Sequence, residues 1–150
     1  ISILNEQKVC IICGIPGIGK TTLAEMLILH YIDRGYDAVR ISSDIDEAFS
    51  FDYHNVPRVF YYDDFLGMAV IGDKLNKNED QRLLEFVRTI EKSSSSLLIL
   101  TTREYILNQA IRQHERLAHW VNEPNKCVIE LSKYTRKAKS MILESTVFSA

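Results

Sequence analysis

The sequence has no apolar run of membrane-spanning length, and its N-terminus lacks the pattern of a signal peptide. A transmembrane helix needs about 20 consecutive apolar residues, and a secretory signal needs a basic segment followed by an apolar one. Neither sign of charge is in large excess, because the chain has 18 basic and 20 acidic side chains and a formal net charge of −2. We therefore expect no direct contact with nucleic acid or with a membrane surface.

Cysteine is scarce as well, with three residues in the whole chain. Cys10 and Cys13 have the C-x-x-C spacing of a redox motif or half a zinc site, but Cys127 is the only other cysteine. Residues 10 and 13 of a strand point to opposite faces, so their side chains would not meet at one site. We interpret Cys10 and Cys13 as buried strand residues. The odd cysteine count indicates a reducing cytoplasm.

The pattern along the chain predicts a single α/β domain. A chain of 150 residues with 46% hydrophobic residues is long enough for one compact core. Strand-like and helix-like segments alternate, which is typical of a parallel sheet covered by helices on both faces. The expected strands are 8–13, 38–42, 58–62, 97–100 and 126–131, and the expected helices are 20–34, 44–51, 78–92, 104–122 and 135–143. Because the chain begins with Ile1, we expect residues 1–150 to be a fragment of a longer multidomain protein.

The segment from Gly14 to Thr21 carries the most specific signal. It reads GIPGIGKT and matches the phosphate-binding pattern G-x-x-x-x-G-K-[ST], the Walker A motif, between a strand-like run and a helix-like run. In such a loop, backbone N–H groups and a helix N-terminus surround the phosphates. Lys20 would reach the β- and γ-phosphates, and the Thr21 hydroxyl would bind Mg²⁺. The candidate nucleotide-binding residues are Gly14, Pro16, Gly17, Ile18, Gly19, Lys20, Thr21 and Thr22.

An acidic pair follows the third predicted strand. Residues 59–62 are mostly apolar and lead into Asp63 and Asp64, which is a Walker B pattern. A carboxylate at the end of a buried strand can hold Mg²⁺ through water, and we assign that role to Asp63. Asp64 would orient or polarise the attacking water. Many hydrolases of this broad group have Glu at this second position, and the shorter Asp predicts slow turnover.

Arg103 is the third candidate site residue. It follows the fourth predicted strand, and ligands of open α/β sheets lie outside the carboxyl ends of the strands. A guanidinium group there can contact the γ-phosphate through two hydrogen bonds and distinguish ATP from ADP. An alternative is a surface arginine paired with Glu104 or with solvent. Tyr61 and Tyr62 alternate across the third strand and are interpreted as packing residues.

Three segments together resemble the STAND class of P-loop NTPases, and most closely its third novel STAND NTPase family. They are GIPGIGKTTLAE, FYYDDFLG and LLILTTREYILNQA. The resemblance covers nearly the whole chain. It implies a P-loop core of the additional-strand type with strand order 5-1-4-3-2. By position, Lys20 and Thr21 match the Walker A pair, Asp63 and Asp64 the Walker B acids, and Arg103 the arginine of the family's TTR element.

The resemblance also implies a function. Members bind ATP, hydrolyse it slowly and switch between an ADP-bound resting state and an ATP-bound assembled state. They are typically multidomain proteins of immunity and conflict systems, with an effector on one side and a sensor on the other. For this chain it implies ATP or ADP and Mg²⁺ as ligands, protein partners through flanking domains, and ATP-dependent self-association of the full-length protein.

Other functions remain open at this point. A P-loop kinase would transfer the γ-phosphate to a small acceptor, although such enzymes use an arginine-rich lid and the sequence offers only Arg112 and Arg116 in a predicted helix. A nucleotide-binding interaction module would bind without turnover. A GTPase is disfavoured because the segment 76–79 has Glu79 where the N-K-x-D motif needs Asp.

Overall fold

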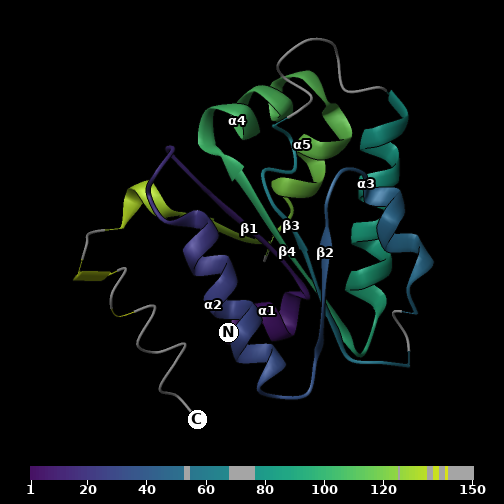
Figure 1. The fold of residues 1–150 in the computed structure, drawn as a ribbon. Helices are drawn as coiled ribbons and strands as arrows, with labels where there is room; N and C mark the ends of the chain where they lie inside the picture. The colour runs from purple at the N-terminus through teal and green to yellow at the C-terminus, as the bar shows by residue number, and fades with distance from the viewer. Residues whose placement is uncertain (53–54, 68–76, 125, 135–136, 139–140, 142–150) are drawn as a thin grey trace.

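A computed structural model describes residues 1–52, 55–67, 77–124, 126–134, 137, 138 and 141. Five parallel strands form one sheet in the order β2-β3-β4-β1-β5 (Figure 1). In that order, the strands are β2 (Asp37–Ile41), β3 (Arg58–Tyr62), β4 (Ser96–Arg103), β1 (Val9–Gly14) and β5 (Cys127–Glu130). The α/β class and the strand order expected from the sequence are therefore confirmed.

Helices cover both faces of the sheet (Figure 1). One face carries α1 (Ser2–Gln7) and α2 (Lys20–Ile32). The opposite face carries η1 (Ile45–Ser50), α3 (Lys77–Lys92), α4 (Glu104–Gln113) and α5 (Glu115–Val121), and the short 3-10 turn η2 (Leu131–Lys133) follows β5. No helix in the described part of the chain combines the length and the apolar character needed to cross a bilayer.

The central strands are buried on both sides, which explains their continuous apolar sequences. Every residue of β1 is buried, and successive side chains of this strand enter the two cores in turn. Cys10 belongs to the core under α2, whereas Cys13 belongs to the core on the opposite face. Both thiols are buried, as the sequence predicts.

Two elements differ from the expected ones near the carboxyl end of the sheet. The strand β4 continues beyond Leu100, because Thr101, Thr102 and Arg103 go on pairing with β1. The helix expected over 104–122 is two helices, since His114 has extended backbone (φ −125°, ψ 98°) that interrupts the helical hydrogen bonds.

Smaller differences occur at the remaining helices. The helix α1 was not expected, and it ends where Lys8 takes a left-handed conformation with φ 66°. The helix α3 begins at Lys77, one residue before the expected start at residue 78, a shift that is common at helix ends. Most of the helix expected over 135–143 lies outside the described residues.

Candidate nucleotide site

The loop between β1 and α2 has the backbone conformation that its glycines allow. Gly17 (φ 77°) and Gly19 (φ 102°) occupy the left-handed region, where a side chain would be strained. A Cβ atom on Gly14 would lie 2.9 Å from the Ile18 side chain, which is too close for an unshifted contact. These positions therefore require glycine for a physical reason.

Lys20 begins α2 and folds back onto the loop. Its ammonium group donates a hydrogen bond to the Ile15 carbonyl oxygen at 3.0 Å. The first α2 hydrogen bond runs from the Leu23 N–H to the Gly19 oxygen, also at 3.0 Å. The free N–H groups of the helix start and the Lys20 charge thus lie together at the carboxyl edge of the sheet, which is an arrangement suited to an anion.

The Asp63 carboxylate is held by groups from three other elements. One oxygen, Oδ1, accepts hydrogen bonds from the Thr21 hydroxyl at 3.4 Å and from the Thr101 hydroxyl at 2.5 Å. The other oxygen, Oδ2, lies 3.9 Å from the Arg40 guanidinium. The structure therefore brings the two predicted metal-binding residues, Thr21 and Asp63, into direct contact.

The surroundings of Asp63 favour its charged form. Burial opposes ionisation, but the Thr101 and Tyr61 hydroxyls, the Arg40 charge and the Thr21 hydroxyl together hold the pKa of Asp63 below its usual value. A carboxylate that stays ionised is the ligand that a hard divalent cation requires. Within the described part of the chain, no cluster of three or more His, Cys, Asp or Glu residues forms a metal cage. One carboxylate and one hydroxyl beside a phosphate loop nevertheless fit Mg²⁺, which usually keeps several waters and completes its shell with substrate phosphates.

Asp64 has an unusual backbone conformation. Its φ of 48° places a non-glycine residue in the left-handed region, a conformation often found at functional sites. The Asp64 N–H donates to the Thr101 hydroxyl at 2.9 Å, so Thr101 joins both acidic residues. A Cβ atom on Gly67 would overlap the Asp64 carboxylate, which explains the glycine after this turn.

Arg103 ends β4 beside the start of the phosphate loop, since it pairs in register with Gly14 of β1. One guanidinium nitrogen, Nη2, lies 3.4 Å from the Asp64 carboxylate, and the other, Nη1, donates to the Tyr105 hydroxyl at 3.2 Å. The Tyr105 hydroxyl and the Asp64 charge raise the pKa of Arg103, so the side chain stays charged. The partner of Arg103 is thus Asp64, whereas the alternative raised from the sequence was Glu104 or solvent.

Three residues around this site were not predicted from the sequence to belong to it. They are Arg40, Tyr61 and Thr101. Thr101 had a detectable signal, because a polar residue follows the apolar run of β4 at the same edge as the predicted site. Tyr61 shares a strand face with Asp63 by alternation, but its ring alone suggested packing. Arg40 could not be placed until the pairing of β2 with β3 was known.

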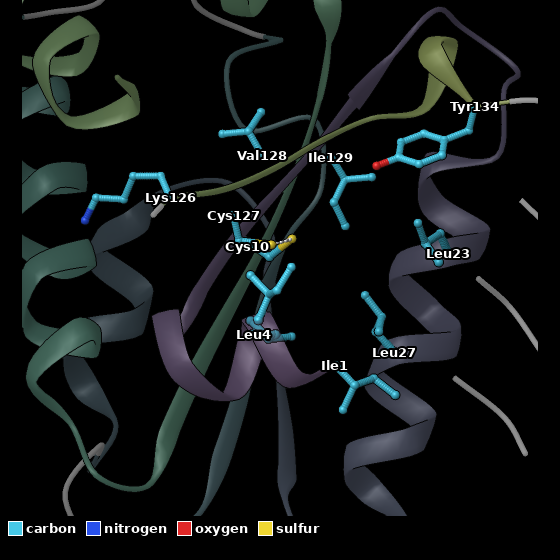
Figure 2. Close-up of a pocket in the computed structure, with 11 residues that line it drawn as sticks. Ile1, Leu4, Cys10, Leu23, Leu27, Lys126, Cys127, Val128, Ile129 and Tyr134 are labelled. Carbon is cyan, nitrogen blue, oxygen red and sulfur yellow. Dashed lines mark hydrogen bonds between the residues drawn. The ribbon is translucent and has the colours of Figure 1, made fainter. Parts of the chain in front are cut away.

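A separate cavity of about 310 Å³ lies between α1, α2 and β5 (Figure 2). Leu4, Leu23, Leu27 and Ile129 line it, and the Cys10 and Cys127 sulfur atoms lie 3.0 Å apart beside it. None of the predicted site residues is among its lining residues. The polar groups expected to bind nucleotide therefore gather at the edge of the sheet and not in this apolar cavity.

Comparisons with known proteins support the same fold. The comparison with curated proteins gave no match. Among solved structures, the ORC2 protein of Aeropyrum pernix, in its ADPNP-ADP complexes, is similar with a TM-score of 0.51 and 14% sequence identity. The similarity covers 93% of this chain but 45% of the ORC2 chain, so this chain spans less than half of that protein. Residues 1–149 match the family described as Novel STAND NTPase 3, and the chain therefore belongs to this family of NTPases.

Proposed function

We propose that this chain binds ATP with Mg²⁺, hydrolyses it slowly and acts as a nucleotide-dependent signalling switch. The proposal rests above all on the convergence of three separate elements at one edge of the sheet. The Thr21 hydroxyl contacts Asp63, and Arg103 contacts Asp64, although these pairs lie about 40 positions apart in the sequence. The ADPNP-ADP complexes of the similar ORC2 structure support adenine nucleotides as the ligands.

Each residue has a distinct part in this proposal. The loop amides and the Lys20 ammonium group neutralise the charge of the phosphates. Thr21 and Asp63 would hold Mg²⁺, which when bound supplies positive charge beside the phosphates. Arg103 contacts the γ-phosphate. Asp64 orients the attacking water, and because its side chain is shorter than that of Glu, this step is slow.

The biological part of the proposal follows from the membership of this chain in the Novel STAND NTPase 3 family. In a full-length cytoplasmic protein, the core would change its contacts with flanking effector and sensor domains when ATP replaces ADP. Self-association in the ATP-bound state would then produce an output in immunity or conflict. The proposed switch depends on the proposed site, because Arg103 is the group that would distinguish ATP from ADP.

Phosphate release from ATP tests the catalytic part. We expect slow release of free phosphate that Asp64→Asn abolishes while ATP binding is retained. Asp33→Asn, which changes an exposed acid beyond the end of α2, is the matched control and should leave the rate unchanged. Release that continues at the wild-type rate in Asp64→Asn would contradict the assignment. Transfer of phosphate to an added small acceptor would indicate a kinase instead.

A further inference from the structure

The Tyr61 hydroxyl is a buried polar group that forms no hydrogen bond of good geometry with the residues that the structure describes. The residue is 4% exposed and lies in β3, with its ring in the core beneath α2. Among the residues that the structure describes, no group meets its hydroxyl oxygen with hydrogen-bond geometry. Native proteins pair nearly all buried polar groups, because an unpaired one loses its hydration without compensation. The described part of the chain therefore leaves this hydroxyl without a well-formed hydrogen bond.

The hydroxyl faces the predicted metal site. Tyr61 precedes Asp63 by two positions, so both residues lie on the α2 side of the sheet. Burial raises the pKa of Tyr61 to about 12, and the nearby groups that also affect this pKa are the Asp63 carboxylate and the Thr101 and Thr21 hydroxyls. These are the same groups that hydrogen-bond to one another around Asp63.

Packing alone does not explain a tyrosine at this position. A phenylalanine would fill nearly the same volume of the core without burying an unpaired hydroxyl. The adjacent Tyr62 differs, because it packs against the core on the opposite face of the sheet and its hydroxyl donates to the Ser43 carbonyl oxygen at 3.2 Å. The Arg40 guanidinium lies 5.9 Å from the centre of the Tyr61 ring and 3.9 Å from the Asp63 carboxylate. The Tyr61 ring therefore also stabilises the Arg40 cation beside this carboxylate.

We propose that Tyr61 is a positioning residue for hydrated Mg²⁺. Its hydroxyl forms a hydrogen bond to a water molecule of the Mg²⁺ shell that Asp63 holds, and this bond satisfies the buried oxygen. Thr21, Thr101 and Tyr61 then fix the carboxylate and the water from three directions. The inference rests on the proposed function, since it needs the ion to bind at this edge of the sheet.

A Mg²⁺ titration tests the inference. Binding of a fluorescent ADP analogue is measured in EDTA and at increasing Mg²⁺ for the wild type, Tyr61→Phe and the matched control Tyr62→Phe. We expect Tyr61→Phe to need about fivefold more Mg²⁺ for half-maximal effect, the loss of one hydrogen bond, with unchanged binding in EDTA. Its melting temperature in EDTA should not fall, because the lost hydroxyl forms no well-formed hydrogen bond with the described residues. Tyr62→Phe should follow the wild-type Mg²⁺ curve.

The outcomes separate the two hypotheses. Overlapping Mg²⁺ curves for Tyr61→Phe and a Mg²⁺-responsive wild type would overturn the role of Tyr61 and leave the nucleotide site intact. An equal loss of binding with and without Mg²⁺ would also overturn it, because that result indicates a structural role. A wild type that binds no ADP analogue in either condition would overturn the proposed function and the role of Tyr61 together.

Discussion

Arg103 lies 3.4 Å from the Asp64 carboxylate, so the expected γ-phosphate sensor is paired with the acid expected to orient water. The pair joins the ends of β4 and β3, two strands that are neighbours in the sheet. A γ-phosphate that attracts the guanidinium would weaken this ion pair and release the Asp64 side chain. Recognition of ATP and preparation for hydrolysis would then depend on the same contact.

Replacement of Arg103 tests this coupling. Arg103→Ala should lower ATP affinity by about tenfold or more, because a charge-assisted hydrogen bond is lost, while ADP affinity changes little. Calorimetric titration with both nucleotides in Mg²⁺ measures the ratio. Arg112→Ala, an exposed residue of α4, is the matched control. An unchanged ratio of ATP to ADP affinity in Arg103→Ala would exclude the sensor role.

Thr101 and Thr102 provide a pair of adjacent threonines with opposite expectations. Thr101→Val removes the hydroxyl that donates to Asp63 and accepts from the Asp64 N–H, and we expect the free energy of unfolding to fall by about 1–3 kcal/mol. The Thr102 hydroxyl is buried and has no hydrogen-bond partner among the described residues, so Thr102→Val should be neutral or stabilising. Urea denaturation compares the two variants. Equal losses of stability would show that the Thr101 bridge contributes nothing specific.

Glu47 predicts a pH dependence of stability away from the site. The Ser43 hydroxyl and the N–H groups of Ser42, Ser43 and Asp44 donate to its carboxylate and lower the pKa of Glu47 to about 2. Because this pKa is lower than the value of about 4.3 expected in the unfolded chain, the stabilisation is complete above that value and is lost as the pH falls toward about 2.

Glu47→Gln should therefore be less stable than the wild type at pH 7, and the difference should shrink between about pH 4 and pH 2. Chemical denaturation at several pH values measures it. Glu25→Gln, an exposed position on α2, serves as the control. A difference that stays constant down to pH 2 would mean that the carboxylate charge is not the source of the stabilisation.

Much of the fold could be predicted because its signals are local. The strand β3 was predicted with its observed bounds, since Arg58 follows a proline and the apolar run ends at Tyr62. The break at His114 could not be foreseen, because the apolar spacing continues through it and the extended conformation of one residue decides the outcome. Core packing explains the break between the two helices, because Leu117 and Trp120 of α5 reach the same core as α4.

Those site residues could be predicted whose type is fixed by the local backbone conformation or by the charge that the site needs. The glycines of the phosphate loop, Lys20 and the acidic pair belong to this group. Thr101 was not assigned a role and Tyr61 was assigned only to packing, because their place in the site depends on where their hydroxyls lie after the sheet has formed. Polar residues of common types can be assigned to a site only when the register between the strands is known.

Calorimetric titration of ATP in Mg²⁺ into Lys20→Ala tests the central claim most directly. The control is Lys92→Ala, which removes an exposed lysine at the end of α3. The wild type and the control should bind ATP with equal affinity, whereas Lys20→Ala should lose about a hundredfold or more in affinity, since the ammonium group contacts the phosphates. Wild-type ATP affinity in a folded Lys20→Ala variant would contradict the assignment of the loop as the nucleotide site.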